Sequence, residues 1–332
     1  KNQNAFSSYE AASESNVLIG TMSTMLREFF STKKKILACN FTSNNVYDLV
    51  SIDRFEKKFF NADSDSLSKL INDYPFLFPS NFNKEEWVNI KNDSLRKFIF
   101  NESIKKYDDK KLNREISALY SNLSNEFSDF NSPKIITLNN GIDYQFKIIT
   151  TDSLVLLSLD CYLDNQDLYK NIPSYISQRM SEEFLVRDLA EKLISRHVIY
   201  PRNRQFISKI IYHGKIYNLM INNFDFDEKK ALNYNEIEIV WAKNNEKEVW
   251  KFFIENEILF NTSNDLDERF INFGPYSKFG ISIDYESAPM IGRWIGYKIV
   301  KSYLKSNNKT IEEILNMNEY ELYLNSNYKP GL

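Results

Sequence analysis

The sequence predicts a predominantly helical α+β protein that contains one small antiparallel sheet. Apolar residues recur with helical periodicity over residues 84–107 and 110–130, and again from residue 172 onward. Between these regions, residues 132–163 hold short runs rich in isoleucine, valine and leucine, separated by turn-forming residues. Glycine and proline number only 8 each in 332 residues, which argues against long linkers and glycine-rich β-meanders.

Each predicted element follows from its local pattern. Residues 46–55 alternate like a strand before a helical pattern begins, and a capped helix within residues 64–79 stops at Pro75. The strand-like runs that follow centre on Ile136, on Tyr144 to Ile148 and on Leu156. Later helical segments are predicted at residues 172–180, 182–198, 203–223, 232–242, 245–258, 288–306, 310–316 and 318–326.

The N-terminal residues differ from the rest of the chain. Residues 1–45 are polar and rich in serine and asparagine, and we interpret them as a tail or leader with a linker. Within them the stretch KKKILAC, residues 33–39, resembles an atypical lipid-attachment box, because a small alanine directly precedes Cys39. No proline-rich segment interrupts the chain afterwards, so residues 46–332 are predicted to form a single domain.

Composition and missing motifs exclude several classes of function. The net charge is −3, from 42 basic and 45 acidic residues, and no basic patch alternates with aromatic residues, so nucleic-acid binding is not expected. No apolar run is long enough for a membrane-spanning helix. The phosphate-loop, dinucleotide-binding and HExxH motifs are absent, and two histidines cannot form a histidine-rich metal site. We therefore expect no cofactor.

One pair of predicted helices has the spacing of a zinc site without the matching residues. The segment EEFLVRDLAEKLISRHV carries Arg187, Asp188 and Glu191 within about one turn, and His213 follows on the next helix. This layout resembles a thermolysin-like zinc site, but an arginine and two carboxylates replace the usual ligands. We interpret the pair as ion-paired helices of the core, with neither a metal nor a catalytic role.

The C-terminal stretch APMIGRWIGYKIVKSYL is the most distinctive in the chain. Gly292 and Gly296 lie four residues apart on one face of the predicted helix, which permits another backbone to approach closely. We predict that Arg293 forms an ion pair with an upstream carboxylate such as Asp284 or Glu286, and that with Trp294 it holds the preceding loop. These residues are expected to have a structural or interaction role.

Many short blocks that occur in order carry a resemblance to a known family. They include IDRFEKKFF at 52–60, YPFLFPSNF at 74–82, SKIIYHGKIYNLM at 208–220 and SKFGISIDYESAPMIGRWIGYKIVKSYL at 277–304. Over residues 46–330 the chain resembles the GldB family of gliding-motility lipoproteins from Bacteroidota.

This resemblance implies a location and a role. It implies a membrane-anchored lipoprotein of the cell envelope that faces the periplasm, with Cys39 at the place of the lipidated cysteine. It implies other gliding and type IX secretion proteins as partners. The family is distantly similar to predicted HExxH zinc proteases, which implies a zincin-like core with a degenerate motif. On that alignment, Arg187, Asp188 and Glu191 replace HExxH and His213 replaces the later glutamate, so a non-catalytic structural or interaction protein is implied.

Two alternatives stay open at the level of the sequence. The chain is a hydrolase if Asp188, Glu191 and His213 converge in an open cleft. It is a peptide- or carbohydrate-binding lipoprotein if several tryptophans line one groove; the four are Trp87, Trp241, Trp250 and Trp294. The triplet Asp-Ser-Leu also resembles a short O-glycosylation pattern of exported proteins in that phylum, and its candidate positions are Ser66 and Ser94.

Overall fold

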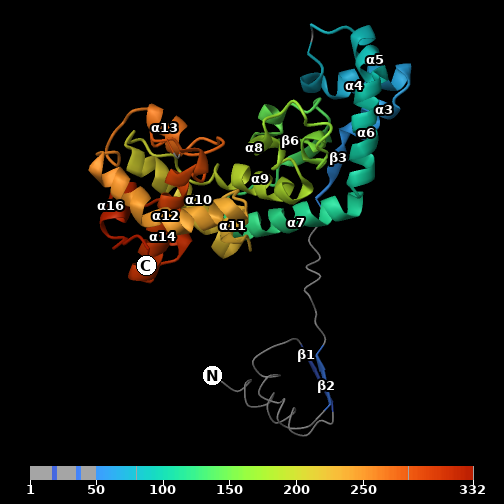
Figure 1. Cartoon of the computed structure of the whole chain (residues 1–332). Coiled ribbons are helices and arrows are strands. Elements are labelled where there is room, and N and C mark those ends of the chain that lie inside the picture. The colour runs from blue at the N-terminus through green and yellow to red at the C-terminus, as the bar shows by residue number, and fades with distance from the viewer. Residues whose placement is uncertain (1–16, 21–34, 39–49, 80, 283, 332) are drawn as a thin grey trace. The chain divides into compact units, whose positions relative to one another are not determined.

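The computed structural model describes residues 17–20, 35–38, 50–79, 81–282 and 284–331 (Figure 1). Contacts divide the chain at Leu49, and the site described below belongs to the unit that begins at Val50. Ahead of that boundary, strands β1 (Val17–Gly20) and β2 (Lys35–Ala38) pair in parallel, from Val17 opposite Lys35 to Gly20 opposite Ala38. The tail predicted over residues 1–45 lies mostly outside the described residues.

Helices make up most of the unit that begins at Val50, as the sequence predicts (Figure 1). The first group, α3–α7, precedes most of the sheet, and the second group, α8–α16, follows it. Their bounds are α3 Phe55–Asn61, α4 Ser64–Asp73, α5 Lys84–Asn92, α6 Ser94–Lys106, α7 Asp109–Glu126, α8 Ser174–Ser177, α9 Glu182–Ile194, α10 Phe206–Asn223, α11 Glu228–Ala231, α12 Glu236–Glu255, α13 Asp265–Phe270, α14 Ile291–Asn307, α15 Ile311–Ile314 and α16 Glu319–Leu324.

The sheet is small but mixed, which corrects the antiparallel sheet predicted above. It has four strands in the order β3-β4-β6-β5, namely β3 Ile52–Arg54, β4 Lys134–Leu138, β6 Leu154–Ser158 and β5 Ile148–Thr150. The β3–β4 and β4–β6 pairs are parallel, and only β5–β6 is antiparallel. Parallel strands need a long crossover connection, and helices α3–α7 supply one between β3 and β4.

Apolar residues cover both faces of this sheet, which accounts for the continuous apolar runs of its strands. Along β4, Ile135 belongs to the large core that includes α9, α10 and α14, whereas Ile136 belongs to a smaller core with Phe55, Phe59 and Phe78. Successive side chains of a strand point to opposite faces, so the sheet separates the two cores. The larger core positions the site.

Helices α10 and α14 pack so closely that their backbones touch. A Cβ atom built on Gly296 would lie 1.8 Å from the carbonyl oxygen of Ile210, and one on Gly214 would lie 2.2 Å from the carbonyl oxygen of Gly296. Gly292 is also close to another backbone, because its Cβ would lie 2.9 Å from the oxygen of Phe270. The glycines therefore bring the inward faces of the two helices together, where only residues without a side chain fit.

Some predicted boundaries differ from those observed. The two helices predicted at residues 232–242 and 245–258 form one helix, α12, whose N-terminus has a capping box between Asn235 and Glu238. Residues 144–146 form a 3-10 turn before β5 instead of strand.

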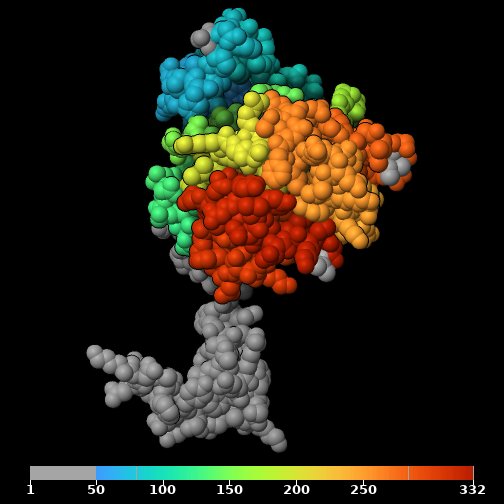
Figure 2. All heavy atoms as spheres, turned by 90° about the vertical axis from the view of Figure 1, so that its left-hand side faces the viewer, coloured from blue at the N-terminus to red at the C-terminus, as the bar shows by residue number. Residues whose placement is uncertain are grey.

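Figure 2 shows α12 beside the C-terminal helices on one face of the molecule. Among the described residues, no helix is both long and apolar enough to cross a bilayer.

Candidate functional site

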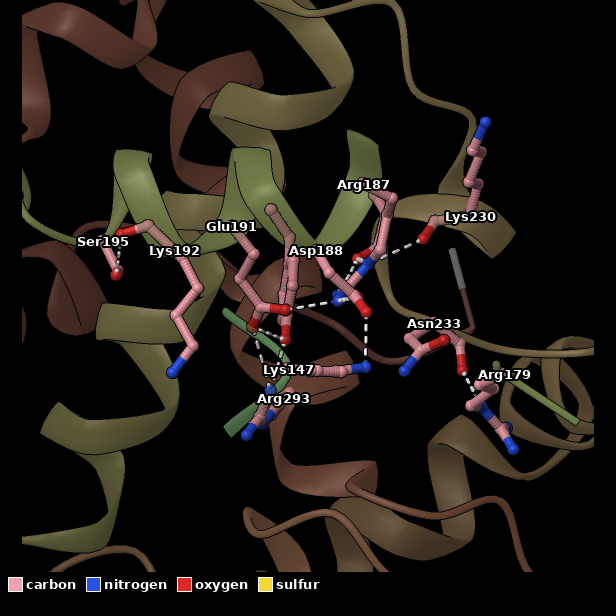
Figure 3. Close-up of polar contacts among 12 residues, drawn as sticks. Lys147, Arg179, Arg187, Asp188, Glu191, Lys192, Ser195, Lys230, Asn233 and Arg293 are labelled. Atoms are coloured by element: carbon pink, nitrogen blue, oxygen red, sulfur yellow. Dashed lines mark hydrogen bonds and ion pairs between the residues drawn. The ribbon is translucent and has the colours of Figure 1, made fainter. Parts of the chain in front are cut away.

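A cavity of about 650 Å³ lies between α9, α10, α14 and the segment that leads into β5. Five of the residues singled out from the sequence line it: Arg187, Asp188, Glu191, His213 and Arg293. From the sequence, the first four belonged to the hypothesis about the helix pair, and Arg293 belonged to the separate hypothesis about the C-terminal stretch. The fold brings them into a single cluster, with the α9 residues above Lys147 and Arg293 in Figure 3.

Arg187 is the centre of this cluster. It is only 3% exposed, and it lies on α9 with Asp188 and Glu191. Its Nη2 and Nε donate hydrogen bonds to the carbonyl oxygen of Ala231 at 2.7 and 3.2 Å. Its Nη1 lies 2.5 Å from a Glu191 oxygen and 2.8 Å from an Asp188 oxygen. The guanidinium therefore uses all three nitrogens, and both carboxylates share its charge.

Two further cations reach the same carboxylates from other elements. Arg293 Nη1, from α14, lies 3.2 Å from Glu191 Oε1, and Lys147 Nζ lies 2.5 Å from Asp188 Oδ2. The Tyr217 hydroxyl, from α10, donates to Glu191 at 3.0 Å and accepts from Arg293 at 2.7 Å. Three cations, two carboxylates and the Tyr217 hydroxyl thus form one network that joins α9, α10, α14 and the segment before β5 (Figure 3).

The network keeps both carboxylates ionised. Burial by itself would raise the pKa of Glu191, but the charges of Arg187 and Arg293 lower that pKa to about 2. Burial also opposes ionisation of Asp188, and the charges of Lys147 and Arg187 nevertheless hold its pKa below the ordinary value. A carboxylate with so low a pKa is a poor acceptor for a proton near neutral pH, which is unfavourable for a general base.

His213 lies in the cavity wall as a neutral ring. Burial, together with the nearby positive charge of Arg293, lowers the pKa of His213 well below its usual range. Its Nδ1 atom is buried and has no hydrogen-bond partner among the described residues. Over the same residues, no group of three or more histidine, cysteine, aspartate or glutamate side chains is placed to hold a metal ion. Zinc sites usually need at least three such ligands.

The predicted contact between Arg293 and Asp284 does not form. Arg293 instead points to Glu191 and donates from Nε to the carbonyl oxygen of Ile271 at 2.7 Å. The Asp284 carboxylate accepts hydrogen bonds from the backbone N–H groups of Phe279 and Gly280 at 3.1 and 2.9 Å, so the loop holds itself without the arginine. The prediction failed because proximity in sequence favoured Asp284, whereas helix packing presents Arg293 to α9.

Trp294 does not hold the loop either. Its side chain is fully buried, and Nε1 donates to a carboxylate oxygen of Glu246 on α12 at 3.2 Å. Trp87 lies in the smaller core with its ring 5.0 Å from that of Phe78, and Trp250 packs against Tyr328. Trp241 lies beside Phe279, and a small cavity there includes none of the other tryptophans. The four tryptophans therefore do not line one groove, which was the sequence signal for a peptide- or carbohydrate-binding surface.

The remaining predicted positions lie away from the cavity. Cys39 lies outside the described residues. Ser66 is exposed on α4, and Ser94 is exposed at the first position of α6. Exposure is what a modification of a serine hydroxyl requires, and both positions meet that requirement.

Sequence reasoning missed several residues that complete the site. Lys147 lies 41 positions before its partner Asp188, in a segment with no recognisable motif. Lys192, Arg179 and Tyr217 also lie in or beside the cavity. Of these, only Lys192 could have been found from the sequence, because it follows Glu191 on the predicted helix. An ion pair between residues that are far apart in the sequence leaves no local sequence pattern.

The fold and the site define a class of protein: a predominantly helical α+β domain with a cleft that is walled by a salt-bridged cluster of arginine, lysine and carboxylate side chains. Residues 40–330 match the model of the family described as gliding motility protein GldB, and the chain belongs to this family. The family is one of gliding-motility lipoproteins of the cell envelope and is not a known enzyme family. No curated protein and no solved structure matches the chain, so the zincin-like core stays a prediction.

Proposed function

We propose that this GldB-family chain is a non-catalytic, lipid-anchored component of the gliding and type IX secretion apparatus. In this proposal it faces the periplasm and acts as a structural or interaction protein for other components of that apparatus. The observation that supports it best is the pairing of Asp188 and Glu191 with Arg187, Arg293 and Lys147. These are the side chains that an enzyme built on this helix pair would need in an unpaired state.

The rival hydrolase is less well supported. A hydrolytic centre needs a base whose pKa lies near the working pH, or a metal-bound water. Glu191 has a pKa of about 2, and the pKa of His213 is also lowered, by burial and by Arg293. In a protein that only binds a partner, the same cluster would serve to hold α9, α10 and α14 together. That structural role needs no proton transfer.

Modification of the chain is part of the proposal. A lipid on Cys39 would attach the protein to a membrane, and sugars on Ser66 and Ser94 would mark it as an exported protein. The two serines lie on the exposed sides of α4 and α6, where a sugar would meet no core residue.

Replacing Cys39 with serine tests the anchoring. We expect Cys39→Ser to move the protein from the membrane fraction to the soluble fraction of the producing bacterium, and to prevent it from restoring gliding to a strain that lacks the gene. A single acyl chain gives only marginal membrane binding, so the loss of all chains should be clear in fractionation. Immunoblots of both fractions and the mass of the intact protein give the measurement.

The second cysteine supplies the control. Cys161 is buried and free, so Cys161→Ala should leave the protein in the membrane fraction. If Cys39→Ser also stays there, or if the intact parent protein carries no acyl chains, lipidation at Cys39 is wrong.

A further inference from the structure

The cleft beside α9 carries more positive than negative charge. Its cationic lining residues are Lys147, Arg179, Arg187, Lys192 and Arg293, and its carboxylates are Asp188 and Glu191. Arg179 is neutralised from outside the cleft, because its Nη2 lies 2.5 Å from Glu238. Four cations then face two carboxylates, and the excess favours a negatively charged ligand.

Three nitrogen atoms in this wall have no partner among the described residues. Lys192 forms no ion pair there, and Figure 3 shows its ammonium group extending to the same side of α9 as Lys147 and Arg293. Arg293 uses Nε and Nη1 in its contacts, which leaves Nη2 as a free donor. The buried Nδ1 of His213 is the third. They come from three different helices and are available to a ligand that binds between these helices.

The edge of the sheet also borders the cleft. Strand β5 lies at the edge of the sheet, and Lys147 and Ile148 line the cavity. The carbonyl oxygen of Lys147 accepts from Ser158 on β6, and the N–H of Thr151 donates to Leu154. Because hydrogen-bonding direction alternates along an antiparallel pair, the backbone N–H and C=O of Ile148 point away from β6. The next outward carbonyl, that of Thr150, already accepts from Arg196 at 3.3 Å, so Ile148 is the residue of this edge left to pair with the backbone of an extended peptide.

The other walls suit a chain with apolar side chains. Aromatic and aliphatic residues surround the polar cluster, among them Tyr144, Tyr175, Tyr212, Phe273, Ile176 and Met290. A volume of about 650 Å³ lies within the range of pockets that enclose a ligand. Excess positive charge, an edge strand and aromatic walls together fit a short extended peptide with a carboxylate better than they fit a neutral sugar.

We propose that this cleft binds an extended acidic peptide segment, whose carboxylate is held by Lys192 and the free donor of Arg293. The carboxylate is either a side chain or the C-terminal group. The proposal rests on the proposed function, because it names the kind of partner that a non-catalytic interaction protein of this family would hold. Arg187 and Lys147 keep their present carboxylate partners and position the site without touching the ligand.

Binding of labelled peptides to the purified full chain tests the proposal. The probes are N-terminally fluorescein-labelled peptides: one with glutamate and phenylalanine residues and a free C-terminus, the same peptide amidated at its C-terminus, a glutamine version with a free C-terminus, and a lysine version. Fluorescence anisotropy gives the affinities at low and high salt. We expect the first peptide to bind and the lysine peptide not to bind, with weaker affinity at high salt. The amidated and glutamine peptides show which carboxylate is recognised.

A charge reversal at Lys192 links binding to the cleft. Lys192 is exposed and free of ion pairs within the described part of the chain, so Lys192→Glu should fold normally and weaken binding about tenfold or more. Lys247→Glu is the matched control, because it makes the same charge change on an exposed position of α12 away from the cleft. Equal affinities of the two variants, or equal binding of acidic and lysine peptides, would overturn the proposal, as would no binding at all.

Mass spectrometry of the peptides after incubation separates this inference from the proposed function. Peptides that bind and stay intact support both. Peptides that bind and are cleaved keep the acidic-peptide site but contradict a non-catalytic role. Failure to bind removes the peptide inference alone, because anchoring at Cys39 is measured independently by fractionation.

Discussion

Gly296→Leu is expected to lower the free energy of unfolding by about 3 kcal/mol or more, because the new side chain has no space between α10 and α14. Even a Cβ atom at this position would lie 1.8 Å from the carbonyl oxygen of Ile210, which belongs to rigid helix backbone. The helices must separate to admit it, and the core contacts around Gly214 and Arg293 would then be lost. Urea unfolding followed by circular dichroism measures the change.

A graded series makes this test specific. Gly296→Ala should also destabilise the protein, though by less than leucine does. Gly274→Ala is the control, since a Cβ there would lie 3.7 Å from the nearest atom, the carbonyl oxygen of Tyr276, at an ordinary contact distance. Its stability should stay within about 0.5 kcal/mol of the parent. A Gly296→Leu protein as stable as the parent would show that the close contact of α10 and α14 is not formed.

Glu191→Gln is expected to destabilise the protein by about 2–3 kcal/mol at neutral pH, because it leaves Arg187 and Arg293 without the carboxylate they share. Arg187 is only 3% exposed, so water cannot replace that partner easily, whereas the Glu191 side chain is 21% exposed and tempers the effect. The control is Glu255→Gln, which removes only an exposed pair with Lys251 at 3.8 Å and should change stability little.

The same variant has a defined pH dependence. The ordinary pKa of the group is 4.5, and in the folded protein the pKa of Glu191 is about 2. A lowered folded-state pKa contributes stability that is fully present above about pH 4.5 and is lost as the pH falls toward 2. The difference between parent and Glu191→Gln should therefore shrink over that range in urea unfolding curves. A difference that stays constant as the pH falls would mean that Glu191 is not held ionised by the two arginines.

The helices of the site could be predicted from the sequence, and their mutual contacts only in part. The apolar periodicity of α9, α10 and α14 is a local property, and the two glycines of α14 indicated a close backbone contact without naming Ile210 as its partner. The ion pair between Arg293 and Glu191 joins residues 102 positions apart, and nothing in either helix identifies the other. Sequence reasoning chose a carboxylate just upstream, Asp284 or Glu286, and was wrong because it favoured proximity in the sequence.

The sheet shows the same limit. Its strands were located by their β-branched and aliphatic runs, but their direction depends on the crossover formed by α3–α7. Lys147 reaches the site only because β5 pairs with β6 at the edge of this sheet. The positive cleft is therefore a product of tertiary structure, although most of its carboxylate and arginine residues had been singled out individually.

Metal analysis of the purified full chain most directly tests the proposed non-catalytic role, in which Arg187, Asp188, Glu191 and His213 form an ion-paired cluster and hold no zinc. The protein is prepared without chelators, dialysed against buffer with and without added zinc, and measured by inductively coupled plasma mass spectrometry beside a His213→Ala variant. We expect no stoichiometric zinc in either protein. One zinc per parent chain that is lost in His213→Ala would contradict it.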